Sequence, residues 1–162
     1  MFGACYGLRI GDAVNRKKSE IVTDMEGNRF FEFCPAKKRS GGKIRLPVMP
    51  QMESLIAKSP TNRLCPSLSG VATSLLSKQW GSIMEACKVE IKETQMKTKI
   101  WRNKGFHSLR YFSKSQLIGT GTDSRMADLI NNHTDSKVAE GYTKVEMPKL
   151  QEAIEKAVQG LW

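Results

Sequence analysis

The sequence predicts an α+β domain, mostly helical, in which helices surround a small three-stranded antiparallel sheet. Three short strand-like runs follow one another between residues 21 and 48, with turn residues between them. Segments with apolar residues at helical spacing lie on both sides of these runs, and the most regular is residues 147–160. The 162 residues contain no internal repeat, low-complexity run or linker, which indicates a single domain.

The first part of the chain is predicted to hold one helix, the three strands and a second helix. Residues 5–18 are predicted to be helical, with apolar side chains available for the core: Leu8, Ala13 and Val14. The predicted strands are Ile21–Thr23, Arg29–Cys34 and Lys43–Val48, joined by turns at Asp24–Asn28 and Ser40–Gly42. Pro50 suits the first turn of a helix that runs to about Lys58, and Ser59–Ser67 is predicted to be a loop.

The second part of the chain is predicted to be helical apart from one basic segment. A helix starts at Leu68, and its apolar stripe consists of Leu68, Val71, Leu75, Ile83, Met84 and Cys87. Residues 88–104 have no clear period and are predicted to form a loop that touches a ligand. Two further helices are expected at Ser108–Ile118 and Ser124–Asn131, the latter capped by Asp123 or Ser124.

The last predicted helix, residues 147–160, is amphipathic. Its apolar residues recur at steps of three or four: Met147, Leu150, Ile154, Val158 and Leu161. Such a stripe packs either on the core of its own chain or on a neighbouring subunit, and the sequence leaves both alternatives open.

The charge of the chain points to a polyanionic partner. Lys and Arg number 26 against 16 Asp and Glu, which gives a formal net charge of +10. The basic residues gather in two segments, 37–45 and 88–114, as expected of a face that binds DNA. No run approaches the length of a transmembrane helix and no secretory signal is recognisable, so we expect a soluble protein in the cytoplasm, on DNA or the nucleoid.

The four cysteines are predicted to be reduced thiols, mostly buried. Cys5, Cys34, Cys65 and Cys87 include no Cys-x-x-Cys pair, and neither histidine completes a zinc-finger spacing. The sequence therefore implies no metal site.

Three motifs along the chain carry a specific pattern. They are Gly7-Leu8-Arg9 followed by Asp12, then His107-Ser-Leu-Arg110, then Asn132-His133 followed by Tyr142. The offset from Arg110 to His133 is 23 residues and that from His133 to Tyr142 is nine. In order and spacing, residues 5–157 resemble the catalytic domain of the tyrosine recombinases, the phage-integrase family. The chain departs from the family pattern at Asn132, where glycine is usual, and at Tyr111, where histidine is common.

The resemblance implies a site that breaks and rejoins DNA strands. Arg9 and Arg110 would clamp the nonbridging oxygens of a pentavalent phosphorane, where planar guanidinium forks suit the developing charge. Asp12, one helical turn after Arg9, would buttress the Arg9 guanidinium.

By the same resemblance, Tyr142 is the nucleophile that forms a 3′-phosphotyrosyl bond. A phenol is a poor nucleophile at neutral pH, so His107 would act as its base, and His133 would hydrogen-bond the phosphate. The bond energy of the phosphodiester is conserved in this exchange, so no cofactor, metal or ATP is implied.

The leaving 5′-oxygen needs a proton, which in the family comes from a lysine in a β-hairpin. Counting back from Pro47 reaches Arg39, or Lys38 with one more turn residue. Arginine is a poor acid, which favours Lys38 and leaves Arg39 in a supporting role. Residues expected to bind the DNA backbone are Lys37, Lys43, Lys99, Arg102 and Lys104.

The resemblance also bears on organisation and partners. Residues 1–162 would form a single, partial catalytic domain, because the family places a DNA-clamping domain before the first arginine. The partner would be double-stranded DNA, with self-association through the helix at 147–160. Two other functions remain open: a noncatalytic DNA-binding or regulatory remnant of an integrase, and an enzyme similar to type IB topoisomerases.

Overall fold

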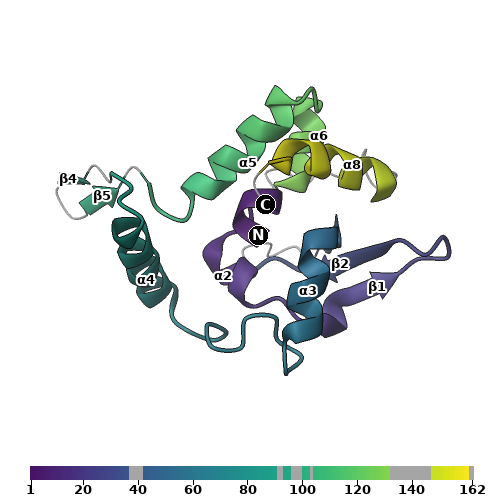
Figure 1. Ribbon diagram of the computed structural model, residues 1–162, viewed down its shortest axis with the longest axis horizontal. Helices are drawn as coiled ribbons and strands as arrows, with labels where there is room; N and C mark the ends of the chain where they lie inside the picture. Colours follow the sequence, from purple (N-terminus) through teal and green to yellow (C-terminus); the bar gives the residue numbers. More distant parts are fainter. Residues whose placement is uncertain (37–41, 91–92, 96–99, 103, 132–146, 161–162) are drawn as a thin grey trace.

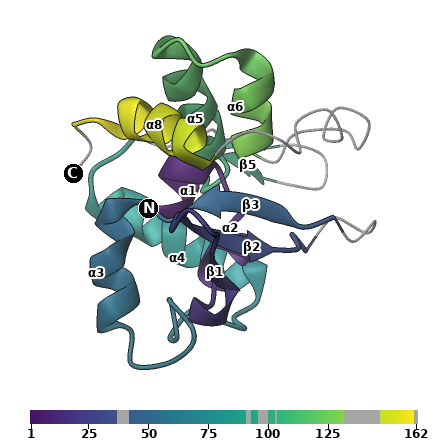
Figure 2. The same ribbon diagram turned by 90° about the vertical axis from the view of Figure 1, so that its right-hand side faces the viewer.

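The computed structural model describes residues 1–36, 42–90, 93–95, 100–102, 104–131 and 147–160. Helix α1 (Phe2–Tyr6) lies between a three-stranded sheet and a group of three helices (Figures 1 and 2). These three helices are α5 (Ser108–Gly119), α6 (Ser124–Ile130) and α8 (Met147–Val158). The α+β class with a small antiparallel sheet is confirmed.

The sheet consists of β1 (Ile21–Thr23), β2 (Arg29–Phe33) and β3 (Ile44–Pro47), with β2 in the middle. All three strands were predicted within one or two residues, and both pairings are antiparallel. In the turn before β2, the Asp24 carboxylate accepts hydrogen bonds from the backbone N–H groups of Glu26 and Asn28, at 3.0 and 2.8 Å. The predicted turn at Ser40–Gly42 falls largely outside the described residues.

Helix α1 joins the inner face of the sheet to the helices on its other side. The ring of Phe2 meets that of Phe31 edge to face at 5.5 Å. Tyr6 is fully buried, and its hydroxyl donates to the carbonyl oxygen of Pro47 and lies 3.3 Å from the Met52 sulfur. Burial raises the pKa of Tyr6 well above its usual range, so the phenol stays protonated and keeps this hydrogen bond.

The helix predicted over residues 5–18 is wrong as one continuous element. The structure has α1 and a second short helix, α2 (Ile10–Val14), with a break between them. Gly7 has φ 57° and ψ 29°, the left-handed conformation that ends helices, and its N–H bonds back to Gly3. Arg9 follows in extended backbone. The spacing of the apolar residues continues across this break, so the sequence pattern alone does not indicate that the helix ends at Gly7.

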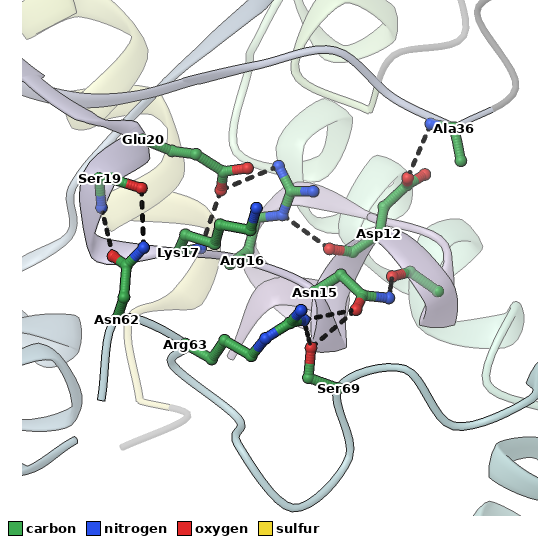
Figure 3. Close-up of polar contacts among 11 residues, drawn as sticks. Asp12, Asn15, Arg16, Lys17, Ser19, Glu20, Ala36, Asn62, Arg63 and Ser69 are labelled. Carbon is green, nitrogen blue, oxygen red and sulfur yellow. Dashed lines mark hydrogen bonds and ion pairs between the residues drawn. The ribbon is translucent and has the colours of Figure 1, made fainter. Parts of the chain in front are cut away.

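Helix α3 (Pro50–Lys58) has the predicted bounds, and Met52 and Ile56 bury their side chains in the core. The predicted loop after it, Ser59–Ser67, contains no helix or strand. Asn15, at the end of α2, fastens the chain just beyond this loop (Figure 3). The Asn15 side-chain oxygen accepts hydrogen bonds from the hydroxyl of Ser69 at 2.8 Å and from the N–H of Gly70 at 3.2 Å. One amide thus positions the chain that leads into the next helix.

Helix α4 (Thr73–Ala86) begins later than predicted and buries a different face. Leu75 and Ile83, expected in the apolar stripe, are 49% and 53% exposed. Leu76 is buried instead, and Trp80, one turn later, meets the ring of Phe106 edge to face at 5.1 Å. The predicted stripe is wrong because the helix starts five residues later and packs on α2 and Phe106 rather than on the sheet.

The segment 88–104 is not a simple loop. It contains an antiparallel hairpin of β4 (Glu93–Gln95) and β5 (Ile100–Arg102), beside α4 at one side of the structure (Figure 1). The prediction missed these strands because the segment is polar and basic, with no cluster or alternation of apolar residues between turn residues like the one that indicated β1.

Helices α5 and α6 have nearly the predicted bounds. Asp123 is the N-cap of α6, and its carboxylate accepts from the N–H groups of Arg125 and Met126. Helix α8 follows the first of the two alternatives left open, since Leu150, Ile154, Ala157 and Val158 are buried against α1, α5 and β3. Self-association through the helix at 147–160 stays a prediction, and within one chain the described apolar face of α8 is already covered.

The four cysteines form no disulfide with one another, but they are not mostly buried as predicted. Cys5 is buried and Cys65 is half-buried, whereas Cys34 and Cys87 are exposed. Among the described helices, none is both long and apolar enough to cross a membrane.

Removing the hydroxyl of Tyr6 should destabilise the fold. Tyr6→Phe leaves the Pro47 carbonyl oxygen without its buried donor, which typically costs about 1–3 kcal/mol. Urea unfolding measures the loss. Tyr111→Phe is the matched control, because Tyr111 is 64% exposed and its change should stay within about 0.5 kcal/mol of wild type. Equal stabilities of the two variants would contradict this account of the core.

Candidate active site

The candidate site is built around the break between α1 and α2. Gly7 is buried there, and its α-carbon faces the end of α6. A β-carbon added to Gly7 would lie 1.8 Å from the side-chain oxygen of Asn131 and 3.2 Å from the γ-carbon of Arg110. The missing side chain of Gly7 therefore provides the space that both neighbours occupy.

Arg110 reaches this break from α5. Its side chain is buried, and Nη1 donates to the carbonyl oxygen of Gly7 at 2.7 Å, across 103 positions of sequence. One turn further along α5, the hydroxyl of Ser113 donates to the carbonyl oxygen of Cys5 at 3.1 Å. These two bonds fix α5 along α1 and hold the Arg110 guanidinium at the Gly-Leu-Arg motif.

Arg9 and Arg110 lie close enough for their charges to interact. Burial, and next the positive charge of Arg9, lower the pKa of Arg110 to about 10, against the opposing effect of the carboxylates of Asp12 and Asp128. Arg110 therefore keeps its charge at neutral pH. Two cations whose charges interact, one of them buried, form a site that an anion would stabilise.

Asp12 ties a third segment to this site. Its buried carboxylate accepts a hydrogen bond from the backbone N–H of Ala36 at 3.0 Å (Figure 3). Within the described residues its hydrogen bond therefore comes from Ala36, in place of the expected contact with Arg9. Ala36 immediately precedes the basic run that begins at Lys37, so Asp12 fixes where this run leaves the sheet.

Arg16 holds α2, and with it Asp12, against the sheet. Its guanidinium carbon lies 3.4 Å from the centroid of the Phe33 ring, and its Nε donates to the backbone carbonyl of Asp12 at 2.7 Å. Glu20 lies 3.4 Å from the same guanidinium (Figure 3). Burial lowers the pKa of Arg16, and the carboxylates of Glu20 and Asp12 oppose that shift. Arg16 thus serves the structure and not the site itself.

His107 occupies the N-cap position of α5, three residues before Arg110. Its side chain is exposed, whereas that of Arg110 is buried, so the two residues differ in their access to a ligand. The imidazole meets the ring of Tyr111 edge to face, with 5.4 Å between the ring centroids.

Several predicted site residues lie outside the described residues: Lys37, Lys38, Arg39, Lys99, His133 and Tyr142. Two described residues lie just before these predicted site residues in the sequence: Ala36 before Lys37, and Asn131 before His133. Ala36 is bonded to Asp12, and Asn131, two positions before His133, packs on Gly7. Arg110 and Asn131 therefore meet at the break, and Ala36 is bonded to α2, the helix that follows it.

The expected DNA-backbone residues differ in their surroundings. Lys43 is exposed, but it shares the Glu32 carboxylate with Arg45, at 2.9 and 2.8 Å. Hydrogen bonds from these two cations lower the pKa of Glu32, so the cluster has one net positive charge at neutral pH. Arg102 ends β5 and Lys104 is half-buried two residues later.

Sequence reasoning missed two residues of this site. Asn131 is fully buried and its side-chain oxygen has no hydrogen-bond partner among the described residues, while its amide nitrogen donates to Ala127 at 3.0 Å. One indication in the sequence that Asn131 belongs to the site was its position at the end of a predicted helix, just before the motif that contains His133. The contact between Tyr111 and His107 was visible as a spacing of four on a predicted helix.

No family model, no curated protein and no solved structure matches this chain. The described residues contain no group of three or more histidine, cysteine, aspartate or glutamate side chains placed to hold a metal ion. The motifs and the geometry around Gly7 are therefore the basis for a functional proposal.

Gly7→Ala should disturb the site more than an ordinary glycine substitution. Gly27→Ala is the matched control, because Gly27 also has a positive φ but nothing lies within 4 Å of the place that a β-carbon would take there. Both changes place alanine in a left-handed conformation at about 1–2 kcal/mol. The clash with Asn131 should add about 1–3 kcal/mol for Gly7→Ala, measured by urea unfolding.

A second substitution checks the cause of that difference. Asn131→Ala in the Gly7→Ala background removes the clashing oxygen and should restore part of the lost stability. If Gly7→Ala is no less stable than Gly27→Ala, the close approach of Asn131 to Gly7 is wrong.

Proposed function

We propose that this protein cleaves and rejoins DNA strands through a 3′-phosphotyrosyl intermediate, as a site-specific tyrosine recombinase does. The observation that carries the proposal is that the buried Arg110 guanidinium is bonded to Gly7, two residues before Arg9, although the two arginines are far apart in the sequence. The charge of Arg9 contributes to the lowered pKa of Arg110. Both arginines belong to motifs whose order and spacing resemble that family. A phosphate group between them would relieve the repulsion that the two guanidinium groups exert on each other.

The proposed step is a transesterification, in which one bond from phosphorus to oxygen forms as another breaks. The Tyr142 oxygen attacks phosphorus and gives its proton to His107, while the bond from phosphorus to the 5′-oxygen breaks. The leaving oxygen takes a proton from Lys38, with Arg39 beside it, and becomes a free 5′-hydroxyl. His133 and the two arginines stabilise the charge on the phosphorane, since preorganised charge is usually the largest contribution to catalysis.

The choice of Tyr142 as nucleophile draws support from the other two tyrosines of the chain. Tyr6 is fully buried and its hydroxyl is held by Pro47, so it has no access to a phosphate. Tyr111 is exposed beside the site and is the competitor that an experiment must separate from Tyr142.

The net charge of +10 supports a DNA backbone as the partner. Affinity for a backbone depends on cations that neutralise phosphates and falls steeply with added salt. Lys43 is an exposed cation of this kind, and the sequence of residues 88–114 contains eight further lysine and arginine residues.

The first test is a covalent adduct on nicked suicide duplexes of mixed sequence. The wild-type chain should give a denaturant-stable protein–DNA adduct, which Tyr142→Phe abolishes without loss of DNA binding. Tyr111→Phe, the matched control, should form the adduct as wild type does. An adduct that persists in Tyr142→Phe and disappears in Tyr111→Phe would assign the nucleophile to Tyr111. DNA binding without any adduct would instead favour the noncatalytic remnant.

The general acid is tested by substrates with a 5′-thiolate leaving group, which hardly needs a proton. Lys38→Ala should slow cleavage of the ordinary substrate by about 10²- to 10⁴-fold, the usual range for general acid catalysis. The thiolate substrate should restore its rate, whereas Arg39→Ala should show no such selective rescue. Lys43→Ala is the control for a basic residue of the same segment that acts only in binding. Rescue of Arg39→Ala alone would transfer the role to Arg39.

A further inference from the structure

Two aromatic rings lie exposed at the start of α5, directly beside the buried Arg110. Tyr111 is 64% exposed, and His107 is exposed one helical turn before it. Their ring centroids are 5.4 Å apart and their planes meet at 85°, an edge-to-face pair. This edge-to-face geometry is a favourable one for aromatic rings.

Nothing in the described core requires an aromatic residue at position 111. The buried face of α5 consists of Arg110, Ser113 and Leu117, and Tyr111 projects away from it. Ile118 shares the exposed side of α5, and it lies about three turns after His107. Among the described residues, the ring contact with His107 is therefore the interaction that makes use of an aromatic side chain at position 111.

An exposed imidazole at the start of a helix can adopt several side-chain rotamers. A base is effective only when its nitrogen is held within hydrogen-bond reach of the proton that it removes. The ring of Tyr111, one turn along α5, supplies a surface that restricts the imidazole of His107.

We infer that Tyr111 is a positioning residue, which holds the imidazole of His107 in one orientation beside Arg110. The catalytic meaning of this inference rests on the proposed function, in which His107 is the base. The ring contact itself is a property of the free protein and can be measured without DNA.

The first measurement is NMR of the free protein. The chain has two histidines, so His107→Gln identifies the imidazole signals of His107 by their loss. The ring current of Tyr111 should displace these signals in wild type and equally in Tyr111→Phe. Tyr111→Leu should remove this displacement. Ile118→Ala, an exposed apolar substitution on the same helix, should leave them unchanged.

The second measurement is the rate of adduct formation on the suicide duplexes. Tyr111→Leu should slow cleavage by about 2- to 13-fold, the value of an aromatic pair converted to a rate ratio. Tyr111→Phe keeps the ring and should retain the wild-type rate, as should Ile118→Ala.

The outcomes separate this inference from the proposed function. Unchanged His107 shifts in Tyr111→Leu, or a wild-type cleavage rate in that variant, would overturn the positioning role of Tyr111. A wild-type chain that forms no adduct would overturn the proposed function, and NMR would still decide whether Tyr111 orients His107.

Discussion

The hydrogen bond from the Arg110 guanidinium to the backbone carbonyl of Gly7 joins the two halves of this chain, and the surrounding structure depends on it. It can form only because position 7 lacks a side chain, since Asn131 and the stem of Arg110 fill that space. The left-handed backbone of the same glycine ends α1 and directs Arg9 out of the helix. One residue thus determines both the packing of α5 on α1 and the direction in which the first arginine leaves the core.

This arrangement has an electrostatic cost that the fold only partly offsets. Taking a guanidinium out of water is unfavourable, and the nearby charge of Arg9 adds to the effect, as the lowered pKa of Arg110 reflects. The carboxylates of Asp12 and Asp128 act in the opposite direction. However, the Asp12 carboxylate also accepts a hydrogen bond from the backbone N–H of Ala36. Asp128 forms an ion pair with Lys114 at 2.6 Å. The net charge of the side chains around the break therefore stays positive, and a positive site suits a phosphate better than a neutral ligand.

The sequence predicted those parts of the structure that local patterns control. Strands of the sheet alternate or cluster their apolar residues between turn residues, α3 carries a proline at its start, and α6 carries a capping aspartate. The break at Gly7 escaped prediction because a glycine within an apolar run is ambiguous until its neighbours are known. The buried face of α4 escaped because Leu75 and Leu76 are adjacent, and only tertiary contacts decide which of the two turns inward. For the site, motif spacing indicated Arg9 and Arg110, but it held no information on Asn131, whose role is steric.

The sparse burial of α4 has a consequence for cooperativity. Only Leu76 and Gly81 are buried on this helix of 14 residues, whereas α8 buries four residues in 12. Its attachments include the edge of Trp80 on Phe106 and its contact with α2, and the Asn15 amide holds the chain just before it at Gly70. Regions with few buried apolar contacts open at lower free energy than the rest of a domain. The chain therefore has two levels of stability, and α4 with its hairpin can unfold as a local unit while the break at Gly7 remains folded.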